Sequence, residues 1–194
     1  TGLIRKFYKN TVPIVLGGIE ASLRRVAHYD FWGNNVRKSL LFDAKADILV
    51  YGMAEKTIVK LANSLNAGED FKDLRGLCYI SKEPKDGYIE IESFDEVKAD
   101  KLKFIKAFHT YYNNCDPITA KGIMQKQDSR YLIQNPPEFY MSVDEIDKVY
   151  DLPYLRDVHP FYKKQGSIKA LETIKYSITT HHGCYGECNF CAIS

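Results

Sequence analysis

The sequence predicts an α/β fold with a parallel sheet. Two short apolar runs, residues 12–16 and 47–51, are each followed by glycine, as expected of strands that are buried on both faces. A helical repeat of apolar side chains comes after each run. A strand, a crossover and a second strand in this order form a parallel pair. We therefore expect residues 1–112 to form one α/β domain.

Two helices are predicted in this domain, and the sequence pattern of the second is the clearer one. Residues 19–28 carry apolar side chains on one face and arginines on another. Residues 58–65 have apolar side chains at positions i, i+3, i+4 and i+7, and Gly68 follows as a helix-ending residue. The stretch 24–32 mixes cations, a histidine and aromatic rings. Such a mixture can stack on nucleobases, but we interpret it as a helix end with an aromatic cap.

A hairpin and a long helix complete the first domain. Residues 77–80 and 88–91 are apolar runs separated by a turn containing Asp86-Gly87, which predicts a β-hairpin at the edge of the sheet. Ser93 and Glu96 then have the spacing of a capping box, which begins a helix. That helix carries large apolar side chains on one shared face: Leu102, Ile105, Phe108 and Tyr112.

The remainder of the chain divides into a connector and a last segment. Residues 113–166 begin without periodicity and contain several prolines, so we interpret them as a connector. Ser142 and Glu145 repeat the capping box and predict one short helix within it, with Val143, Ile146 and Val149 facing inward. In the last segment, 167–194, apolar and polar residues alternate over 174–178, which predicts a strand.

The composition is that of an ordinary globular protein, with 45% hydrophobic and 27% charged residues. A net charge of +2 is too small to indicate nucleic acid or an anionic membrane as a partner. No apolar run approaches the ~20 residues of a membrane-spanning helix. Five cysteines, of which three are clustered, fit a reducing compartment better than a disulfide framework, and this predicts a cytoplasmic location.

The clustered thiols are Cys184, Cys188 and Cys191, with the spacing Cys-x3-Cys-x2-Cys. Gly186 between them allows a tight turn, so a short loop can direct all three toward one inorganic centre. Thiolates are soft ligands that suit iron–sulfur clusters and zinc. A four-iron cluster normally takes four cysteines, so three would leave one iron open to a ligand that is not protein.

Zinc is the alternative occupant of this motif. It would need a fourth ligand, which His181 or His182 could supply. Structural zinc sites usually pair their cysteines as Cys-x2-Cys, so the spacing here favours iron–sulfur. The other two cysteines, Cys78 and Cys115, follow no ligand spacing, and Cys78 lies in a predicted strand.

The cysteine motif resembles that of the radical S-adenosylmethionine (SAM) superfamily, whose loop reads Cys-x3-Cys-x-aromatic-Cys. The resemblance implies that Cys184, Cys188 and Cys191 ligate a [4Fe–4S] cluster and that Phe190 lies beside the adenine of SAM. It further implies that the open iron binds SAM and that one electron cleaves it to a 5′-deoxyadenosyl radical. An electron donor such as flavodoxin or ferredoxin and a substrate would be the partners.

Further segments narrow the resemblance to the YgiQ-like family of bacterial radical SAM proteins: residues 12–25, 27–30, 43–47 and 134–137, and the histidine-glycine lead into Cys184. The family implies a Rossmann-like domain, similar to cobalamin-binding domains, before a partial TIM-type barrel. Residues 167–194 would then be the first strand and the cluster loop of that barrel. The family does not imply a substrate.

Two other functions remain open: a non-catalytic α/β binding module with structural zinc, and a tRNA-modifying radical SAM methylthiotransferase. The second is disfavoured because its N-terminal domain carries three further cluster cysteines. Cobalamin is also disfavoured, because Asp157-Val158-His159 matches only half of Asp-x-His-x-x-Gly and Tyr162 stands where glycine is needed. The chain begins without Met and stops three residues after Cys191, so we expect an internal fragment that is inactive alone.

Overall fold

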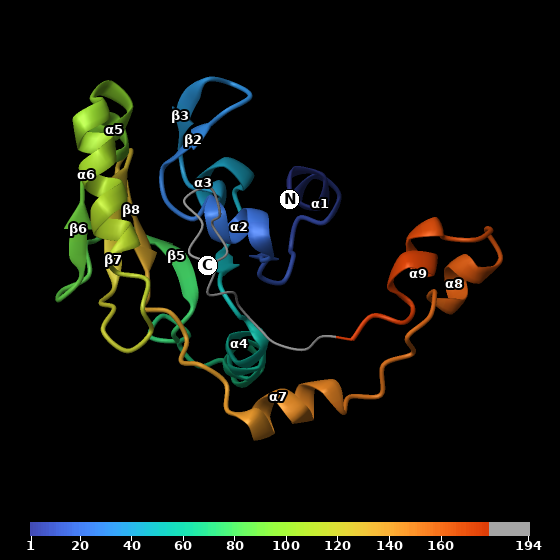
Figure 1. Cartoon of the computed structure of the whole chain (residues 1–194). Helices are drawn as coiled ribbons and strands as arrows, with labels where there is room; N and C mark the ends of the chain where they lie inside the picture. Colours follow the sequence, from blue (N-terminus) through green and yellow to red (C-terminus); the bar gives the residue numbers. More distant parts are fainter. Residues whose placement is uncertain (179–194) are drawn as a thin grey trace. The chain divides into compact units, whose positions relative to one another are not determined.

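The computed structural model describes residues 1–178 (Figure 1). The chain divides into two compact units, Thr1–Met141 and the residues from Ser142 onward. The boundary between them falls inside the segment that was predicted to be a connector. None of the helices within residues 1–178 is both long enough and apolar enough to cross a membrane.

A six-stranded mixed sheet forms the centre of the first unit, in the order β1-β4-β5-β8-β7-β6. Its strands are β1 (Val15–Leu16), β4 (Ile48–Val50), β5 (Leu77–Ser81), β8 (Arg130–Gln134), β7 (Ile123–Gln127) and β6 (Ile89–Ile91). β1 pairs with β4 and β6 pairs with β7 in parallel, and the other neighbours are antiparallel. The α/β prediction is confirmed. The parallel arrangement holds for β1 and β4 but not for the sheet as a whole.

β4 explains why both faces of the sheet are covered. Ile48, Leu49 and Val50 are all buried, so every side chain of this strand needs an apolar neighbour. Leu49 belongs to one core cluster, while Ile48 and Val50 belong to a second cluster. Because side chains alternate along a strand, these two clusters lie on opposite faces of the sheet.

Helices cover the two faces unequally. The Leu49 face packs against α2 (Ile19–Leu23), α3 (Leu40–Ala44), α5 (Phe94–Ala99) and α6 (Lys101–Tyr112), whose buried residues share its cluster. The opposite face packs against α4 (Glu55–Ala67) through Leu61. α4 ends at Gly68 in the left-handed conformation, as predicted. α1 (Gly2–Phe7) is tied to the sheet by an ion pair of 2.7 Å between Arg5 and Asp47.

The first predicted helix is shorter than expected. α2 ends at Leu23, and the chain continues into an antiparallel hairpin of β2 (His28–Asp30) and β3 (Asn35–Arg37). The interpretation of residues 24–32 as a helix end is therefore wrong. The physical reason is tertiary: the backbone N–H of Ala27 donates to the side chain of a distant strand residue, Gln125, at 2.9 Å.

The long helix predicted after Ser93 is two helices. The capping box of Ser93 and Glu96 is confirmed, but α5 ends at Ala99. Asp100 follows it and caps the start of α6 by accepting a hydrogen bond from Leu102 N at 2.8 Å. The predicted apolar face of α6 points to solvent, with Leu102 75% and Phe108 51% exposed. The core instead receives the adjacent face of this helix, through Phe104, Ala107 and Tyr111.

The predicted hairpin of residues 77–91 is wrong, and the true hairpin lies in the predicted connector. β5 pairs with β4 and β8, whereas β6 pairs with β7 at the far edge. β7 and β8 are joined by a two-residue turn in which Asp128 has a positive φ of 56°. Their apolar alternation was obscured because three of the inward-facing residues are glutamines: Gln125, Gln127 and Gln134.

The second unit is described over residues 142–178 and contains α7 (Val143–Tyr150), α8 (Pro160–Lys163) and α9 (Lys169–Ile174). The capping box of Ser142 and Glu145 is confirmed. Of the residues predicted to face inward, Ile146 and Val149 are half-buried but Val143 is 73% exposed.

The strand predicted over residues 174–178 is wrong. Ile174 ends α9, and Tyr176 and Ile178 are each 86% exposed. A strand needs a neighbour to pair its N–H and C=O groups, whereas a helix pairs them internally. No strand is present among residues 142–178 to act as that neighbour.

Candidate functional site

The predicted cluster ligands Cys184, Cys188 and Cys191 lie outside the described residues, as does Phe190. The same is true of the two histidines considered as zinc ligands. Within residues 1–178, no group of three or more His, Cys, Asp or Glu side chains could hold a metal ion. A cluster of buried polar side chains with an adjoining cavity lies in the first unit, on the sheet face covered by α5 and α6.

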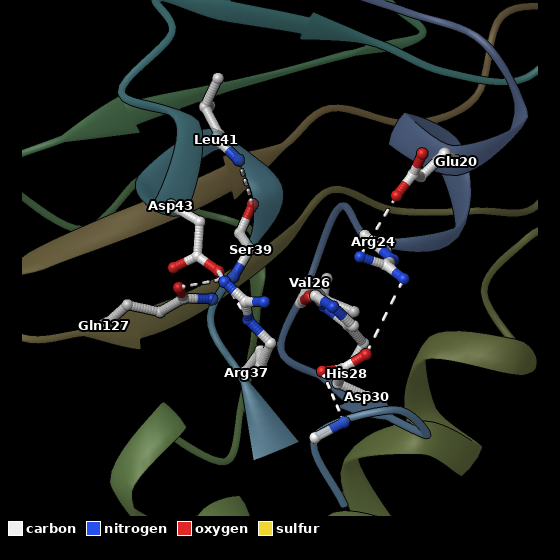
Figure 2. A network of polar contacts seen from close by, with 11 residues as sticks. Glu20, Arg24, Val26, His28, Asp30, Arg37, Ser39, Leu41, Asp43 and Gln127 are labelled. Atoms are coloured by element: carbon white, nitrogen blue, oxygen red, sulfur yellow. Dashed lines mark hydrogen bonds and ion pairs between the residues drawn. The ribbon is translucent and has the colours of Figure 1, made fainter. Parts of the chain in front are cut away.

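Buried glutamines organise this face. Gln125 on β7 accepts hydrogen bonds from Ala27 N and from Gln127 Nε2, both at 2.9 Å, and donates to Glu92 O. Gln127 in turn accepts from the backbone N of Ser39 at 3.0 Å (Figure 2). The two amides thereby fix both ends of the segment that carries the β2–β3 hairpin. Each amide replaces the backbone hydrogen bonds that a regular element would have made for that segment.

Arg25 is held by the third glutamine. It is only 8% exposed, and its Nε donates to Gln134 Oε1 at 3.1 Å. The guanidinium carbon lies 4.4 Å from the ring centre of Tyr51 and 4.6 Å from that of Tyr111, so the cation is stacked between two aromatic rings. Its Nη2 lies 3.9 Å from the Sγ of Cys115. The described contacts of this buried cation are thus with uncharged groups.

Burial keeps the hydroxyl and thiol groups around Arg25 protonated. It raises the pKa of Tyr111 to about 12, and that of Cys78 likewise to about 12, although Arg25 opposes both shifts. The pKa of Tyr51 is raised well above its usual value for the same reason. Cys115 is exposed as a residue, yet partial burial of its thiol still raises its pKa. At neutral pH all four groups are therefore neutral.

A cavity of about 190 Å³ lies beside this cluster. Its walls come from the segment between α2 and β2, from α5 and α6, and from β6 and β7. Most of the lining is apolar, including Val26, Ile91, Val97 and Ala107. Tyr111 lines the cavity and also stacks on Arg25, so the two features share a wall.

His28, on β2, is the histidine that lines the cavity. Its Nδ1 lies 3.2 Å from the carbonyl oxygen of Val26, which can only accept, so Nδ1 carries the proton and donates. Its Nε2 is buried and has no hydrogen-bond partner among the described residues. Burial lowers the pKa of His28, an effect that the Val26 carbonyl opposes and Arg24 reinforces. The imidazole is therefore neutral at physiological pH, with a free acceptor at Nε2.

The charges next to His28 are paired with one another (Figure 2). Arg24 lies 3.2 Å from Glu20 and 3.9 Å from Asp30, and Arg37 lies 2.8 Å from Asp43. These cations are therefore neutralised locally and do not form a phosphate-binding surface. Stacking on nucleobases, the alternative considered for residues 24–32, thus receives no support from the arginines.

Residues 1–177 match the family model described as "Radical SAM N-terminal". The chain belongs to this family. Its relatives carry the name UPF0313 protein. The one from Fusobacterium nucleatum is 60% identical over the whole chain and 34% of its own length. Those from Thermotoga petrophila and Clostridium botulinum (strain 657) are 48% and 47% identical, over 100% and 98% of the chain and 35% and 30% of their own lengths.

The chain thus spans about a third of the length of the curated relatives that it matches. No solved structure matches it. The resemblance to the radical SAM superfamily is confirmed.

Within this radical SAM N-terminal chain, the half-motif Asp157-Val158-His159 has a local structural role. Asp157 forms an ion pair of 2.6 Å with Lys163, and His159 caps α8 by accepting from Phe161 N at 3.2 Å. The ring nitrogen Nδ1 is occupied by that cap. Both contacts are local to the segment around α8.

The glutamines are the site residues that sequence reasoning missed. The signal was present: Ile123, Gln125 and Gln127 occupy alternate positions, as residues on one face of a strand do. Glutamine is polar, however, so this alternation did not predict a strand with a buried face. His28 and Arg25 fell within the mixed stretch 24–32, but nothing local indicated which of its residues were buried.

Proposed function

We propose that this chain belongs to a radical SAM enzyme in which Cys184, Cys188 and Cys191 ligate a [4Fe–4S] cluster. One observation carries the proposal: the residues matched by the radical SAM N-terminal model end at 177, and the Cys-x3-Cys-x2-Cys motif begins at Cys184. The donor set fits, because three soft thiolates suit iron and leave one iron of a four-iron cluster open for SAM.

The other two cysteines support a set of three. Cys78 is fully buried in β5, and with a pKa of about 12 it keeps its proton. Cys115 donates from its Sγ to Tyr111 O at 3.3 Å, and its pKa is also raised. Cluster ligation requires the thiolate. Each of these thiols therefore pays a desolvation cost to ionise, and neither is a fourth ligand in our proposal.

When bound, the cluster would supply the electron for reductive cleavage of SAM to a 5′-deoxyadenosyl radical. We assign Phe190 to packing beside the SAM adenine. The first unit, Thr1–Met141, would serve as an α/β domain N-terminal to the cluster motif. A small electron-transfer protein such as flavodoxin or ferredoxin would be the reductant. The free thiols of Cys78 and Cys115 fit a reducing compartment such as the cytoplasm.

Anaerobic reconstitution with iron and sulfide tests the ligand set. The chain should then bind about four iron and four sulfide and absorb broadly in the visible. Cys184→Ala, Cys188→Ala and Cys191→Ala should each abolish this absorption, because two thiolates do not hold the cluster. Iron content, labile sulfide and the visible spectrum are the measurements.

Two matched variants, Cys78→Ala and Cys115→Ala, control for general loss of thiols and should retain the cluster. Circular dichroism of every variant separates loss of ligation from loss of fold. One bound zinc with no iron after the same treatment would contradict the proposal and favour the structural zinc module instead.

A further inference from the structure

One side of α6 carries large apolar side chains that no described residue covers. Four of them are between 50% and 75% exposed: Leu102, Ile105, Phe108 and Tyr112. Residues three or four positions apart lie above one another on a helix, so these four form one stripe, called here the α6 stripe. We propose that the α6 stripe is the surface on which the part of a longer protein outside these 194 residues packs against this chain.

The α6 stripe is adjacent to the side of the helix that faces the core. The core-facing side chains are Phe104, Ala107 and Tyr111. Phe108 lies one turn from Phe104, so the apolar surface continues from the core to the exposed side. Lys103 and Lys106 lie on the remaining side, where they form ion pairs with glutamates at 2.8 and 2.6 Å. A helix at the surface of a domain normally carries polar side chains opposite its buried face. The pattern of α6 is instead that of a helix covered on two sides.

The cavity of about 190 Å³ extends the α6 stripe onto neighbouring elements. Phe108 belongs both to the stripe and to the cavity wall. Two other lining residues are partly exposed, Leu23 on α2 at 42% and Tyr29 on β2 at 50%. The apolar surface therefore runs from α6 across the cavity to α2 and β2. Contiguous apolar surface marks sites of protein association, and a pocket within it can receive an anchoring side chain.

The length of the relatives indicates what covers this surface. The Fusobacterium nucleatum relative matches the whole chain over 34% of its own length, so about two thirds of it lies outside the match. A covalently linked domain reaches a neighbouring surface at an effective concentration in the millimolar range. A second copy of the chain would lose its translational and rotational freedom on binding. The linked part is therefore the occupant that needs the least additional contact area.

Thiol labelling measures whether this surface is covered. The labelled variants are Leu102→Cys on the stripe, Tyr29→Cys at the cavity, and Val59→Cys on α4 as the matched control. Val59 is 58% exposed, but the polar residues Lys56 and Asn63 flank it on the helix surface. Cysteines are placed at the three aligned positions of the full-length Fusobacterium nucleatum relative. Peptide mass spectrometry after reaction with a maleimide gives the labelling rate of each introduced thiol, separately from the native cysteines.

In this chain alone, Leu102→Cys and Tyr29→Cys should be labelled at rates similar to that of Val59→Cys, because all three positions are exposed. In the full-length relative, the rates at the positions aligned with Leu102 and Tyr29, each divided by the control rate, should be at least about tenfold lower. Labelling there requires the covering part to detach, and a tenfold effect means that the detached form is a minor population.

The proposal is overturned if either relative rate is the same in the two proteins. It is also overturned if Leu102→Cys is already labelled slowly in this chain alone, because the 194 residues would then provide their own cover. Slow labelling of the full-length relative that becomes fast when light scattering shows dissociation to monomers would assign the surface to a second copy, which equally overturns the proposal.

Circular dichroism checks that each variant is folded. Tyr112→Cys, at the other end of the α6 stripe, repeats the test if Leu102→Cys does not fold, and Leu23→Cys does the same for Tyr29→Cys at the cavity. All of these residues lie in the first unit, outside the cysteine motif. The outcomes therefore leave the radical SAM proposal to its own test.

Discussion

Single polar residues decide how the first unit is assembled. Gln125, Gln127 and Gln134 each replace an apolar core residue, and each binds a backbone or side-chain group of the segment from Arg25 to Ser39. A buried amide is stable only when its donors and acceptors are satisfied. These residues therefore specify one position for the segment, where apolar side chains of the same size would allow several.

His28 makes the stability of the chain depend on pH. Burial holds its folded-state pKa below the unfolded value of about 6.5, an effect reinforced by Arg24 and Arg37 and opposed by Asp43. Above that pH both states are neutral and His28 contributes nothing to the pH dependence. As pH falls below it, the unfolded chain binds a proton that the folded chain resists, so stability decreases.

The variant His28→Gln removes the titrating imidazole and therefore its contribution to the pH dependence of stability. We expect the unfolding free energy of wild type, relative to His28→Gln, to fall between pH 7.5 and pH 5. Urea denaturation of both proteins at the two pH values measures the difference, in which titration of the carboxylates cancels. An unchanged difference would mean that His28 is as solvated in the folded chain as in the unfolded one.

The local sequence predicts where helices begin and end in this protein more clearly than it predicts which strands pair. Both capping boxes and the left-handed Gly68 lie where local sequence predicts. Not all strand neighbours follow chain order, since β1 pairs with β4 and β5 with β8. Caps depend on residues within a few positions, whereas pairing depends on which apolar faces meet.

β4 is the element on which the stability of the sheet should depend most. Leu49 is fully buried, and it pairs in register with Leu16 on one side and Cys78 on the other. Leu49→Ala should cost about 2–5 kcal/mol, from lost transfer free energy and the cavity left behind. The shift of the urea midpoint, at unchanged slope, measures this cost.

A surface variant on α4 provides the comparison. Val59 is 58% exposed, so Val59→Ala should change stability by no more than about 0.5 kcal/mol. If the two variants lose similar amounts, the sheet is not the cooperative core of this unit.

At the scale of the whole molecule, the chain combines an α/β unit with a second unit that contains the cysteine motif. The relatives are about three times as long as the segment that matches. Radical chemistry needs an enclosed site, because water and side chains otherwise react with the radical. A complete TIM-type barrel takes roughly 250 residues, more than the whole of this chain.

We therefore expect SAM cleavage to require the longer protein. With dithionite as reductant, the full-length Fusobacterium nucleatum relative should produce 5′-deoxyadenosine, and this 194-residue chain should produce none. Chromatographic detection of 5′-deoxyadenosine is the measurement. Turnover by the chain alone that is lost in Cys188→Ala would show that the chain suffices.

Local sequence determined much of this protein: the strands around Val15 and Leu49, α4 with its glycine end, both capping boxes and the cysteine motif. Each of these depends on neighbours within about one turn or on a fixed spacing. The resemblance carried by the cysteine motif also indicated the superfamily, which the family match confirmed.

Tertiary structure alone decided the rest. The inward face of α6, the burial of the glutamines on β7 and β8, and the cavity at His28 all depend on hydrogen bonds and packing between residues that are far apart in the chain. From sequence alone, a glutamine is predicted to lie on the surface, because its buried hydrogen-bond partner is not known. An apolar face of a helix is predicted to lie in the core, although another face of the same helix can be the one that packs. The physical reason is that a side chain is buried only when a second surface covers it, and the sequence of one segment does not specify that surface.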